Sequence, residues 1–208
     1  MSGCYVVFHK QLGDLLLLEP SFARLKAHHG GPVRVMTRRG HRDLLSLMDG
    51  VEYLGGQSFS WKSNLYCYDP LSKSAFRALF SPVRHRHCIL PEKREMSRIH
   101  PLIFGQVIVP ELGDSYIAQY FWDNTPVPTA LTFRNARLNQ PPADWKPEGL
   151  GNEPYILVNP TSGWRKKSWV AERWVETVKA LHQKHKLPIV MTSASTDWQI
   201  EQCREIVE

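Results

Sequence analysis

Short apolar runs alternate with amphipathic segments along the front of the chain. Each run is rich in aliphatic or aromatic residues and is flanked by Gly, Pro or polar residues, which is typical of buried strands. The segments between them place apolar side chains on one face, which is typical of helices. The pattern predicts strands at residues 4–8, 33–37, 51–54, 64–68 and 87–90, and helices at residues 15–28, 41–48, 73–80 and 115–122. This alternation indicates an α/β fold in which helices cover a parallel sheet. Pro20 lies inside the first predicted helix, where it should kink the helix or shift its start.

Prolines are concentrated in residues 126–154, which hold six of the fifteen prolines of the chain. Such a stretch is not expected to form regular structure and is typical of a linker between domains. The periodic patterns return after it, with strands predicted at residues 155–159 and 189–192 and helices at residues 170–185 and 197–207. We therefore expect a first domain at residues 1–125, a linker at residues 126–154 and a second domain at residues 155–208.

The second domain is short for a doubly wound fold. It has two predicted strands and two predicted helices, whereas such a domain needs further strands to cover both faces of its sheet. Two strands alone would leave apolar surface and backbone hydrogen-bonding groups open. We expect the sequence to be a fragment with an incomplete second domain. The alternatives are that this segment packs on the first domain or pairs with another chain.

Composition excludes several classes of protein. A hydrophobic content of 42% with 22% charged residues excludes an intrinsically disordered chain. No apolar run approaches the roughly 18 residues of a membrane span, and residues 15–18 lack the flanking features of a signal peptide. Cys4, Cys67, Cys88 and Cys203 form no C-x-x-C pair, and neither the cysteines nor the histidines have metal-ligand spacing. We therefore expect reduced thiols in a cytoplasmic protein, and no metal site.

The first segment with candidate chemistry is H-K-Q-L-G-D at residues 9–14, directly after the first strand. Ligands of open α/β sheets bind at the carboxyl ends of strands, so this loop should face the ligand. Gly13 is expected to allow a tight turn or the close approach of a ligand. Asp14 has two interpretations: an N-cap that accepts hydrogen bonds from backbone amides, or a general base that takes a proton from a substrate hydroxyl.

The second segment is N-P-T-S-G-W-R-K-K-S-W at residues 159–169, between a strand and a helix. Its small residues, its three consecutive cations and the following helix N-terminus together predict a site for phosphate or diphosphate. Ser168 is expected to be the N-cap of that helix. The alternative is a solvated basic loop that Ser168 caps. The segment is not a P-loop, because G-x-x-x-x-G-K-[ST] is absent.

In this order, with the proline-rich stretch between them, the two segments resemble the heptosyltransferases of bacterial lipopolysaccharide core synthesis, the inverting glycosyltransferases of family nine. Residues 8–25, F-H-K-Q-L-G-D-L-L-L-L-E-P-S-F-A-R-L, resemble the family's first loop and helix, where a G-D pair precedes leucines and an internal proline. Residues 159–174, N-P-T-S-G-W-R-K-K-S-W-V-A-E-R-W, resemble its P-G-A-S-x-x-x-K-x-W-x-x-E-x-W motif. The resemblance is clear over about residues 1–55 and 154–208 and faint between them.

The resemblance implies a glycosyltransferase-B fold: an N-terminal Rossmann-like domain that binds the acceptor, and the first part of a second Rossmann-like domain that binds ADP-heptose. The implied reaction moves a heptose from ADP-heptose to the inner core of lipopolysaccharide, with inversion at the anomeric centre and with neither a cofactor nor a catalytic metal. Asp14 corresponds to the base that deprotonates the acceptor hydroxyl. Lys167 would contact the donor's phosphates, and Thr161, Ser162 and Gly163 would line the diphosphate.

Two departures from the family pattern limit these expectations. P-T-S-G stands at residues 160–163 where the family has P-G-A-S, so Gly163 replaces a hydroxyl residue and one phosphate hydrogen bond is expected to be lost or moved. The family's later D-T-G-x-x-H segment, which grips the nucleotide sugar, does not occur in these 208 residues. We therefore expect this truncated chain to bind the donor weakly and to turn over little or nothing.

The net charge of +6 draws attention to two basic patches. The first holds Arg34, Arg38, Arg39 and Arg42, and the second holds Arg84, Arg86, Lys93, Arg94 and Arg98. Each is either solvated surface or, under the family interpretation, a surface that attracts the carboxylates and phosphates of an acidic acceptor. The candidate acceptor-binding residues are Lys10, Gly13, Arg38 and Arg39. The same charge could hold the enzyme at the inner face of the bacterial inner membrane.

Two other functions are compatible with the sequence. A non-catalytic remnant would bind acidic glycan without turning over ADP-heptose. A basic nucleic-acid-binding module would account for the charge, but no recognised nucleic-acid motif occurs and the cations are split between two regions. We expect no nucleic-acid partner.

Overall fold

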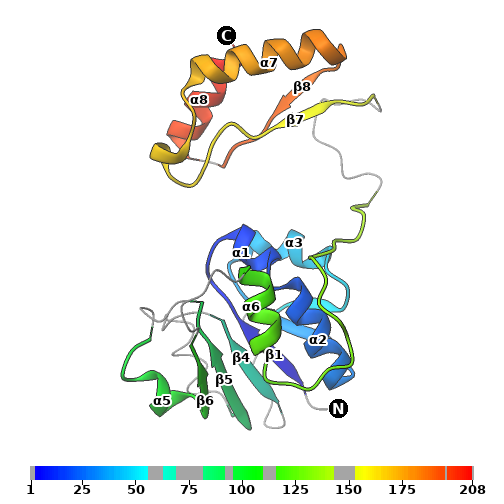
Figure 1. Cartoon of the computed structure of the whole chain (residues 1–208), viewed down its shortest axis with the longest axis vertical. Coiled ribbons are helices and arrows are strands. Elements are labelled where there is room, and N and C mark those ends of the chain that lie inside the picture. The colour runs from blue at the N-terminus through cyan, green and yellow to red at the C-terminus, as the bar shows by residue number, and fades with distance from the viewer. Residues whose placement is uncertain are drawn as a thin grey trace. The chain divides into compact units, whose positions relative to one another are not determined.

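The structure, a computed structural model, describes residues 3–55, 63–68, 82–91, 96–109, 116–142, 153–194 and 196–207 (Figure 1). The chain forms two compact units, Met1–Pro142 and Ala143–Glu208. The predicted helix at residues 73–80 lies outside the described residues. Within the described ranges no helix has both the length and the apolar character that crossing a membrane requires.

A six-stranded parallel sheet forms the centre of the first unit. Its strands are β1 (Cys4–Val7), β2 (Val33–Met36), β3 (Val51–Tyr53), β4 (Asn64–Cys67), β5 (His85–Ile89) and β6 (Gln106–Ile108). They lie in the order β3-β2-β1-β4-β5-β6, and the register places Val6 of β1 opposite Val35 of β2 and Tyr66 of β4. All four residues of β1 are buried, as expected for a parallel strand covered on both faces. The predicted α/β class is confirmed.

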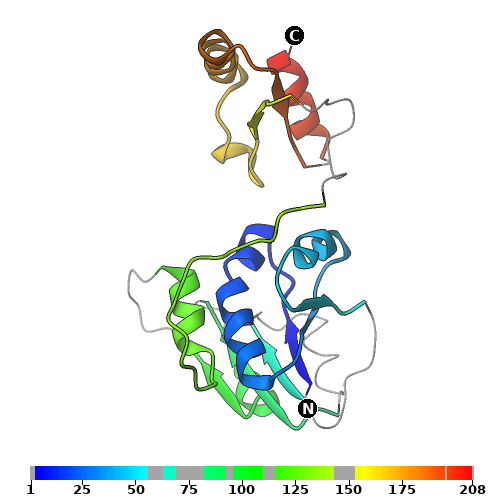
Figure 2. The same ribbon diagram turned by 90° about the vertical axis from the view of Figure 1, so that its right-hand side faces the viewer.

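Among the described residues, most helices pack on one face of this sheet, and the short helix before Phe104 packs on the other. The helices of the unit are α1 (Leu12–Leu16), α2 (Glu19–His29), α3 (Arg42–Ser46), α5 (His100–Ile103) and α6 (Ile117–Asn124), with a 3-10 turn η1 (Arg39–His41). Figure 2 shows α2 in blue beside α6 in green, and the two helices pack against each other. Phe22 and Phe121 share a buried cluster with Val6 on this face. On the other face Val7 packs with Phe104, which follows α5.

The first predicted helix is two helices in the structure. α1 ends at Leu16 and α2 begins at Glu19, with Pro20 in its first turn. A proline there has no amide to leave unbonded, so Pro20 shifts the helix start rather than kinking the helix. The sequence pattern does not predict the strand β6 or the single-turn helix α5.

The stretch after α6 packs on the first unit and forms neither a helix nor a strand between residues 126 and 142. Arg134 contacts both oxygens of the Glu19 carboxylate, each at 2.7 Å, and the Arg137 amide donates to the same carboxylate at 3.0 Å. This anchor joins residues far apart in sequence. The proline-rich stretch therefore begins as part of the surface of the first unit, and the boundaries expected at residues 125 and 154 stay predictions.

Glu19→Gln is expected to lower the free energy of unfolding of the first unit by about 2–3 kcal/mol. Glu19 is only 4% exposed, and the new amide would turn a donor toward the donors of Arg134. Urea unfolding followed by circular dichroism measures the change. Asp49→Asn is the matched control, because the exposed Lys26–Asp49 pair should contribute less than about 1 kcal/mol. Equal effects of the two substitutions would contradict the anchoring role of Glu19.

A partly buried histidine lies at the end of α2. The Nε2 atom of His29 lies 2.9 Å from the Tyr66 hydroxyl, and the Tyr66 ring stacks on His87. Burial first, and then the nearby His28 and His87, lower the pKa of His29 to about 4. The folded state therefore binds fewer protons than the unfolded state between about pH 6.5 and that value.

The contribution of His29 to the free energy of unfolding of the first unit is expected to be fully present above about pH 6.5 and to be lost as the pH drops toward 4. Linkage gives at most about 3 kcal/mol for His29, and solvent screening of this half-exposed ring reduces it to about 1–2 kcal/mol. Thermal unfolding of the unaltered chain and of His29→Gln across this range measures the effect. The substitution should flatten the profile, whereas His185→Gln in the second unit should not. Parallel profiles for all three would exclude His29 as the source.

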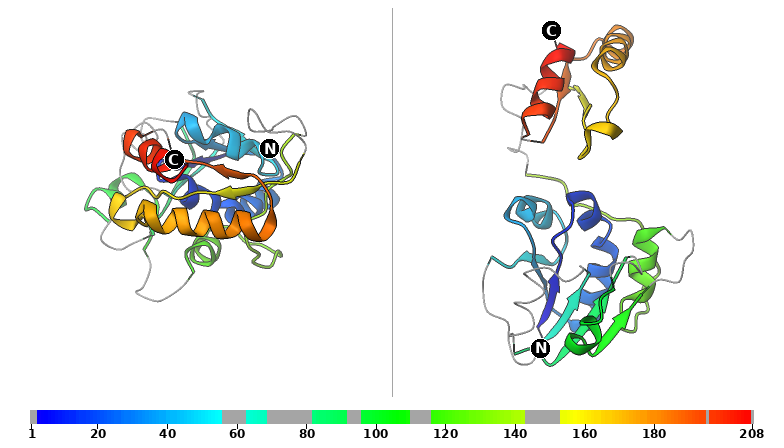
Figure 3. Two further views of the ribbon diagram at one scale, coloured as in Figure 1. Left: turned by 90° about the horizontal axis from the view of Figure 1, so that it is seen from above. Right: turned by 90° about the vertical axis from the view of Figure 1, so that its left-hand side faces the viewer.

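The second unit contains two parallel strands and two helices. These are β7 (Ile156–Val158), α7 (Ala171–His185), β8 (Ile189–Met191) and α8 (Asp197–Val207), with a 3-10 turn η3 (Arg165–Lys167). Leu157 of β7 lies opposite Val190 of β8, and α7 packs against α8. The left panel of Figure 3 shows α7 running alongside both strands. The four main elements agree with the predicted ones to within a residue or two.

Candidate functional site

Asp14 lies in the first turn of α1, shortly after β1. The helix begins at Leu12, and its N-cap residue is Gln11, whose side chain makes no capping hydrogen bond. Asp14 is therefore the third helical residue, and its interpretation as the N-cap is wrong. The leucine run suggests a helix start at Leu15, but the Leu15 amide already donates to the Gln11 carbonyl at 3.1 Å. This geometry leaves the carboxylate half-buried near the carboxyl end of β1.

A pocket of about 360 Å³ contains Asp14. Its wall is apolar apart from one carboxylate and one ammonium, and it is lined by Phe8, Lys10, Asp14, Leu17, Pro91, Ile117 and Phe121. Phe8 and Lys10 follow β1 and Pro91 follows β5, so the pocket lies at the carboxyl edge of the sheet. Apolar walls can pack on the carbon face of a sugar, and a carboxylate can accept the proton of a hydroxyl. The structure thus brings Lys10 and Asp14 into one pocket.

The strand order accounts for the position of this pocket. The chain runs from β1 outward to β2 and β3, and then returns to β4 on the other side of β1. The connections after β1 and β4 therefore diverge, and in open α/β sheets such a point leaves a crevice at the carboxyl ends of the strands. Asp14 follows β1, one of the two strands that flank this point.

Gly13 does not form the tight turn predicted for it. It is a residue of α1, and its φ is not positive. In the part of the chain that the structure describes, no atom beyond its neighbours along the helix lies within 4 Å of the position that a Cβ would take. The backbone therefore does not require glycine here, and the close approach of a ligand to Gly13 stays a prediction.

The first arginine patch divides between two ends of a strand. Arg38 and Arg39 follow β2 at the carboxyl edge of the sheet; both are exposed, and neither lines the pocket above. Arg34 lies inside β2, where its Nε donates to Glu52 at 3.1 Å. Because Arg34 is paired within the sheet, the prediction that it joins the other arginines near the strand end is wrong.

The second patch is only partly described. Arg84 is exposed just before β5. Arg86 lies near the amino end of that strand, whereas the Asp14 pocket lies at the carboxyl end. Arg98 is exposed just before α5, whereas Lys93 and Arg94 lie outside the described residues. The described members therefore do not form one continuous basic surface at the pocket.

Thr37 and His41, which the sequence analysis did not single out, form a buried pair that supports the turn η1 with Arg38 and Arg39. Nδ1 of His41, the last residue of η1, lies 2.8 Å from the Thr37 hydroxyl. Burial, followed by the positive charge of Arg38 and by His9, lowers the pKa of His41. A neutral ring therefore holds the turn that presents Arg38 and Arg39. The only sequence signal is the spacing of a hydroxyl and an imidazole around a strand end, which many loops share.

The loop after β7 is closed by hydrogen bonds among its own residues. The Ser162 amide donates to the Ser168 Oγ at 3.0 Å, and the Ser162 Oγ donates to the Trp164 carbonyl at 2.7 Å. The N-cap of α7 is Val170, so the predicted capping role of Ser168 is wrong. Its hydroxyl closes the loop instead, and α7 begins only after η3 has ended.

Thr161, Ser162, Gly163 and Lys167 lie within this one loop. Lys167 ends η3 and is exposed, and its Nζ lies 5.3 Å from the centroid of the Trp164 ring. Apart from the chain neighbours of Gly163, no atom of the described residues lies within 4 Å of the position that its Cβ would take. A loop with hydroxyls, open backbone and three consecutive cations can hold a phosphate group.

Two further residues shape the loop. Asn159 accepts the Thr161 amide on its Oδ1 at 3.2 Å, which tightens the turn after β7. Trp164 presents its ring to the Lys167 ammonium. Both residues lie in the predicted motif, but neither carries chemistry of its own, so residue type alone did not mark them.

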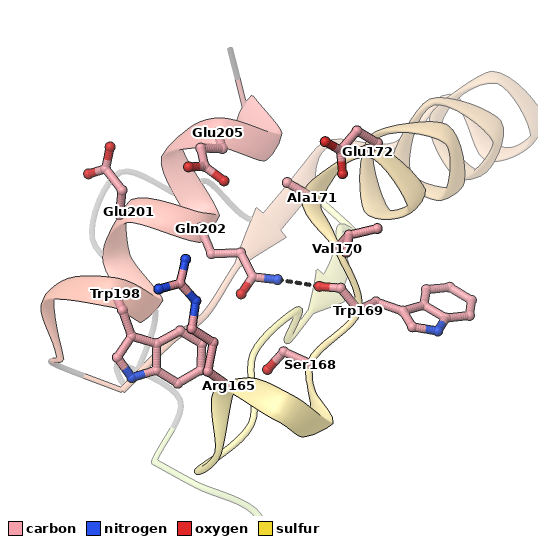
Figure 4. A pocket seen from close by; sticks show the side chains of 10 residues that line it. All are labelled: Arg165, Ser168, Trp169, Val170, Ala171, Glu172, Trp198, Glu201, Gln202 and Glu205. Carbon is pink, nitrogen blue, oxygen red and sulfur yellow. Dashed lines mark hydrogen bonds between the residues drawn. The ribbon is translucent and has the colours of Figure 1, made fainter.

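A pocket of about 410 Å³ lies beside the loop (Figure 4). Arg165 and Ser168 contribute to its lining, together with residues at the start of α7 and along α8. Lys167, Thr161 and Gly163 do not line it. The predicted phosphate-binding residues and this pocket are therefore neighbours rather than a single site.

The described residues show no group of three His, Cys, Asp or Glu side chains that could hold a metal ion. Cys4, Cys67 and Cys88 are buried thiols, and Cys203 is partly buried; none of them forms a disulfide. Burial raises the pKa of the Cys4 thiol well above its usual range, which makes this cysteine a poor nucleophile.

Comparison with known proteins identifies the family. The model of glycosyltransferase family 9 (heptosyltransferase) matches residues 73–208, about two thirds of the chain. The matched segment contains the loop with Lys167, whereas Asp14 lies before it. Curated protein sequences gave no match.

Several solved structures share the fold. E. coli ADP-heptose lps heptosyltransferase II is 18% identical with a TM-score of 0.73, over 99% of this chain and 68% of that one. E. coli heptosyltransferase WaaC with ADP is 14% identical with a TM-score of 0.66, over 99% and 71% of the two chains. The structure of the same enzyme with ADP-2-deoxy-2-fluoro heptose is 13% identical with a TM-score of 0.64, over 99% of this chain and 73% of that one. At these identities the likeness concerns the fold, and it confirms the predicted glycosyltransferase-B type.

The family match and the shared fold agree with the resemblance carried by the two sequence motifs. The match spans more than half of the chain and includes the loop that the motif predicted to bind phosphate. The chain belongs to glycosyltransferase family 9, the heptosyltransferases.

Proposed function

We propose that this protein transfers a heptose from ADP-heptose to the inner core of lipopolysaccharide, with inversion and without a metal or cofactor. The observation that carries the proposal is the loop after β7, where hydroxyls and three consecutive cations precede α7 within the segment that the family model matches. The similar E. coli structures hold ADP and an ADP-heptose analogue, which supports a nucleotide sugar as the donor.

Asp14 is the proposed base. Its carboxylate accepts the proton of an acceptor hydroxyl while that oxygen forms a bond to the anomeric carbon of the donor. The bond from the anomeric carbon to the β-phosphate oxygen breaks, and its electron pair leaves with ADP. Because the nucleophile enters opposite the leaving group, the configuration inverts. The apolar wall beside Asp14 would hold the acceptor sugar.

Lys167 is the proposed contact for the departing diphosphate. ADP gains negative charge as it leaves, and positive groups fixed at that position lower the barrier. Thr161 and Ser162 would line the diphosphate; the Ser162 hydroxyl can donate to it only by leaving the Trp164 carbonyl. Gly163 leaves room for a phosphate to approach the backbone. These groups supply the stabilisation that a metal ion supplies in other transferases, which is why we propose a metal-independent reaction.

Lys10, Gly13, Arg38 and Arg39 are the proposed acceptor-binding residues. All four lie near the carboxyl ends of β1 and β2. Inner-core sugars and lipid A carry carboxylates and phosphates, so acceptor affinity should fall as salt concentration rises. We propose that the enzyme works in the cytoplasm, with peripheral contact to the inner face of the inner membrane.

The first unit is proposed to bind the acceptor and the second to bind the donor. The chain holds no D-T-G-x-x-H segment, so the 208 residues alone are proposed to bind the donor weakly and to turn over little or nothing. The form of the protein that turns over is called the active form in the tests of transfer.

Calorimetric titration with ADP and AMP tests the donor class. ADP should bind at least about tenfold more tightly than AMP, because the loop contacts the second phosphate. Equal affinities would contradict a diphosphate site. Release of ADP from ADP-heptose on addition of core oligosaccharide then measures transfer by the active form. The absence of any acceptor-dependent release would overturn the proposed reaction.

A further inference from the structure

Two buried glutamines of α8 donate hydrogen bonds to the loop between β7 and α7, which holds the proposed phosphate contacts. Gln199 is 5% exposed, and its Nε2 donates to the Ser162 carbonyl at 2.8 Å and to the Thr161 Oγ1 at 3.3 Å. Gln202, one turn further along α8, is 9% exposed, and its Nε2 donates to the Trp169 carbonyl at 2.7 Å. Figure 4 shows the Gln202 side chain crossing from α8 to Trp169. The loop is therefore held near both of its ends.

The orientation of both amides follows from their partners. The carbonyls of Ser162 and Trp169 can only accept hydrogen bonds, so the NH₂ group of each glutamine must face the loop. The Oε1 of Gln199 in turn accepts the Thr196 hydroxyl at the start of α8. Gln199 is therefore fixed at both ends of its amide and is not free to present its oxygen to the loop.

An anion site needs donors on its open side. A backbone loop carries carbonyls as well as amides, and a carbonyl pointing at a phosphate would repel it. The glutamines occupy the carbonyls of Ser162 and Trp169 on the side of α8. An apolar side chain of similar size could fill the same volume, but it would take the hydrogen-bond donor away from both of these partly buried carbonyls.

We infer that Gln199 and Gln202 are positioning residues for the diphosphate site: they hold the carbonyls of Ser162 and Trp169 toward α8, so that these carbonyls do not face the ligand. This inference rests on the proposed donor site, and it adds the element that gives the loop its binding shape. Neither glutamine touches the ligand. Both are missing from the sequence prediction, because glutamine on a helix is normally read as a solvated residue.

Gln199→Glu tests the inference through pH. At about pH 8 the carboxylate faces the Ser162 carbonyl, which can only accept a hydrogen bond, and ADP affinity should fall at least about tenfold. Burial beside carbonyls raises the pKa of such a carboxyl, so by about pH 5 it is protonated and can donate again. The ratio of ADP affinities between the unaltered chain and Gln199→Glu should then shrink to within about threefold. Gln199→Met cannot donate at either pH, and its loss should be the same at both.

ADP and the charged groups common to both chains titrate equally in the unaltered chain and in Gln199→Glu. Their effect therefore cancels in the ratio of the two ADP affinities. The charged residues of η3, of the first turn of α7 and of α8 are Arg165, Lys166, Lys167, Glu172, Arg173, Asp197, Glu201, Arg204 and Glu205. Gln119→Glu on α6 of the first unit is the matched control, because it makes the same change outside the second unit. It should leave ADP affinity unchanged at both pH values.

Amide hydrogen exchange of residues 161–168 in the ligand-free chain separates this inference from the proposed function. Exchange in this loop should be faster in Gln199→Glu at about pH 8 than in the unaltered chain. Unchanged exchange together with unchanged ADP affinity would overturn the positioning role. If the unaltered chain binds no ADP, the donor site fails, whereas faster exchange in the variant would still show that the glutamine shapes the loop. If Gln199→Glu does not fold, Gln202→Glu and Gln199→Met carry the same comparison.

Discussion

Asp14→Asn is expected to abolish sugar transfer by the active form while leaving its affinity for ADP unchanged. The amide keeps the size of the side chain but cannot accept a proton from the acceptor hydroxyl. General base catalysis contributes about 10²–10⁴-fold to a rate, so kcat should fall by about a thousandfold. Asp14 lies in the first unit, whereas the proposed ADP contacts lie in the second. Turnover and donor binding should therefore separate in this variant.

Acceptor-dependent ADP release measures kcat, and calorimetry measures ADP affinity in the same preparations. Asp43→Asn is the matched control, because Asp43 is an exposed carboxylate in the first turn of α3 and lies outside the Asp14 pocket. It should retain nearly full activity. Retained transfer in Asp14→Asn would remove Asp14 as the base, and an equal loss in both variants would indicate a general effect of charge.

Lys167→Met is expected to weaken ADP binding by about ten- to a hundredfold, which is the contribution of one charge-assisted contact to phosphate. Met keeps the length of the side chain and its contact with the Trp164 ring but removes the ammonium. The effect should appear in the 208-residue chain without any turnover, because the loop that makes this contact is part of that chain. Calorimetric titration with ADP gives the affinity directly.

Lys166→Met distinguishes a direct contact between Lys167 and the phosphate from a general effect of the positive charge of η3. Lys166 is also exposed and precedes Lys167 in η3, so both variants lose one positive charge from the same turn. Its expected effect on affinity is below about threefold, in line with an exposed charge screened by salt. Equal effects of the two substitutions would favour a solvated basic loop with no defined phosphate contact.

The main elements of both units could be predicted because their periodicity is strong. β1 is buried on both faces and reads as an unbroken apolar run, and α8 has the same limits in sequence and structure. The start of α1 could not be predicted, because Leu12 and Gly13 carry no helix signal and the first turn is fixed by a backbone bond to Gln11.

The sequence could predict which residues belong to the candidate site, but it could not predict the hydrogen bonds that hold them. The motifs placed Asp14 after a strand and Lys167 before a helix, and the structure has both there. Ser168 was expected to cap α7 because a hydroxyl before a helix usually does, yet it pairs with Ser162, which lies six residues away. The support from Gln199 could not be predicted, since it depends on how α8 packs against a loop 37 residues earlier.

A crystal structure of the active form with a non-transferable ADP-heptose analogue tests the central claim most directly. The claim is that a carboxylate of the first unit and an ammonium of the second act on the same sugar. The predicted result has the Lys167 Nζ within hydrogen-bond distance of the β-phosphate. The Asp14 carboxylate should lie about 5–7 Å from the anomeric carbon, with room for one acceptor hydroxyl between them. A bound donor that contacts neither residue would contradict the account.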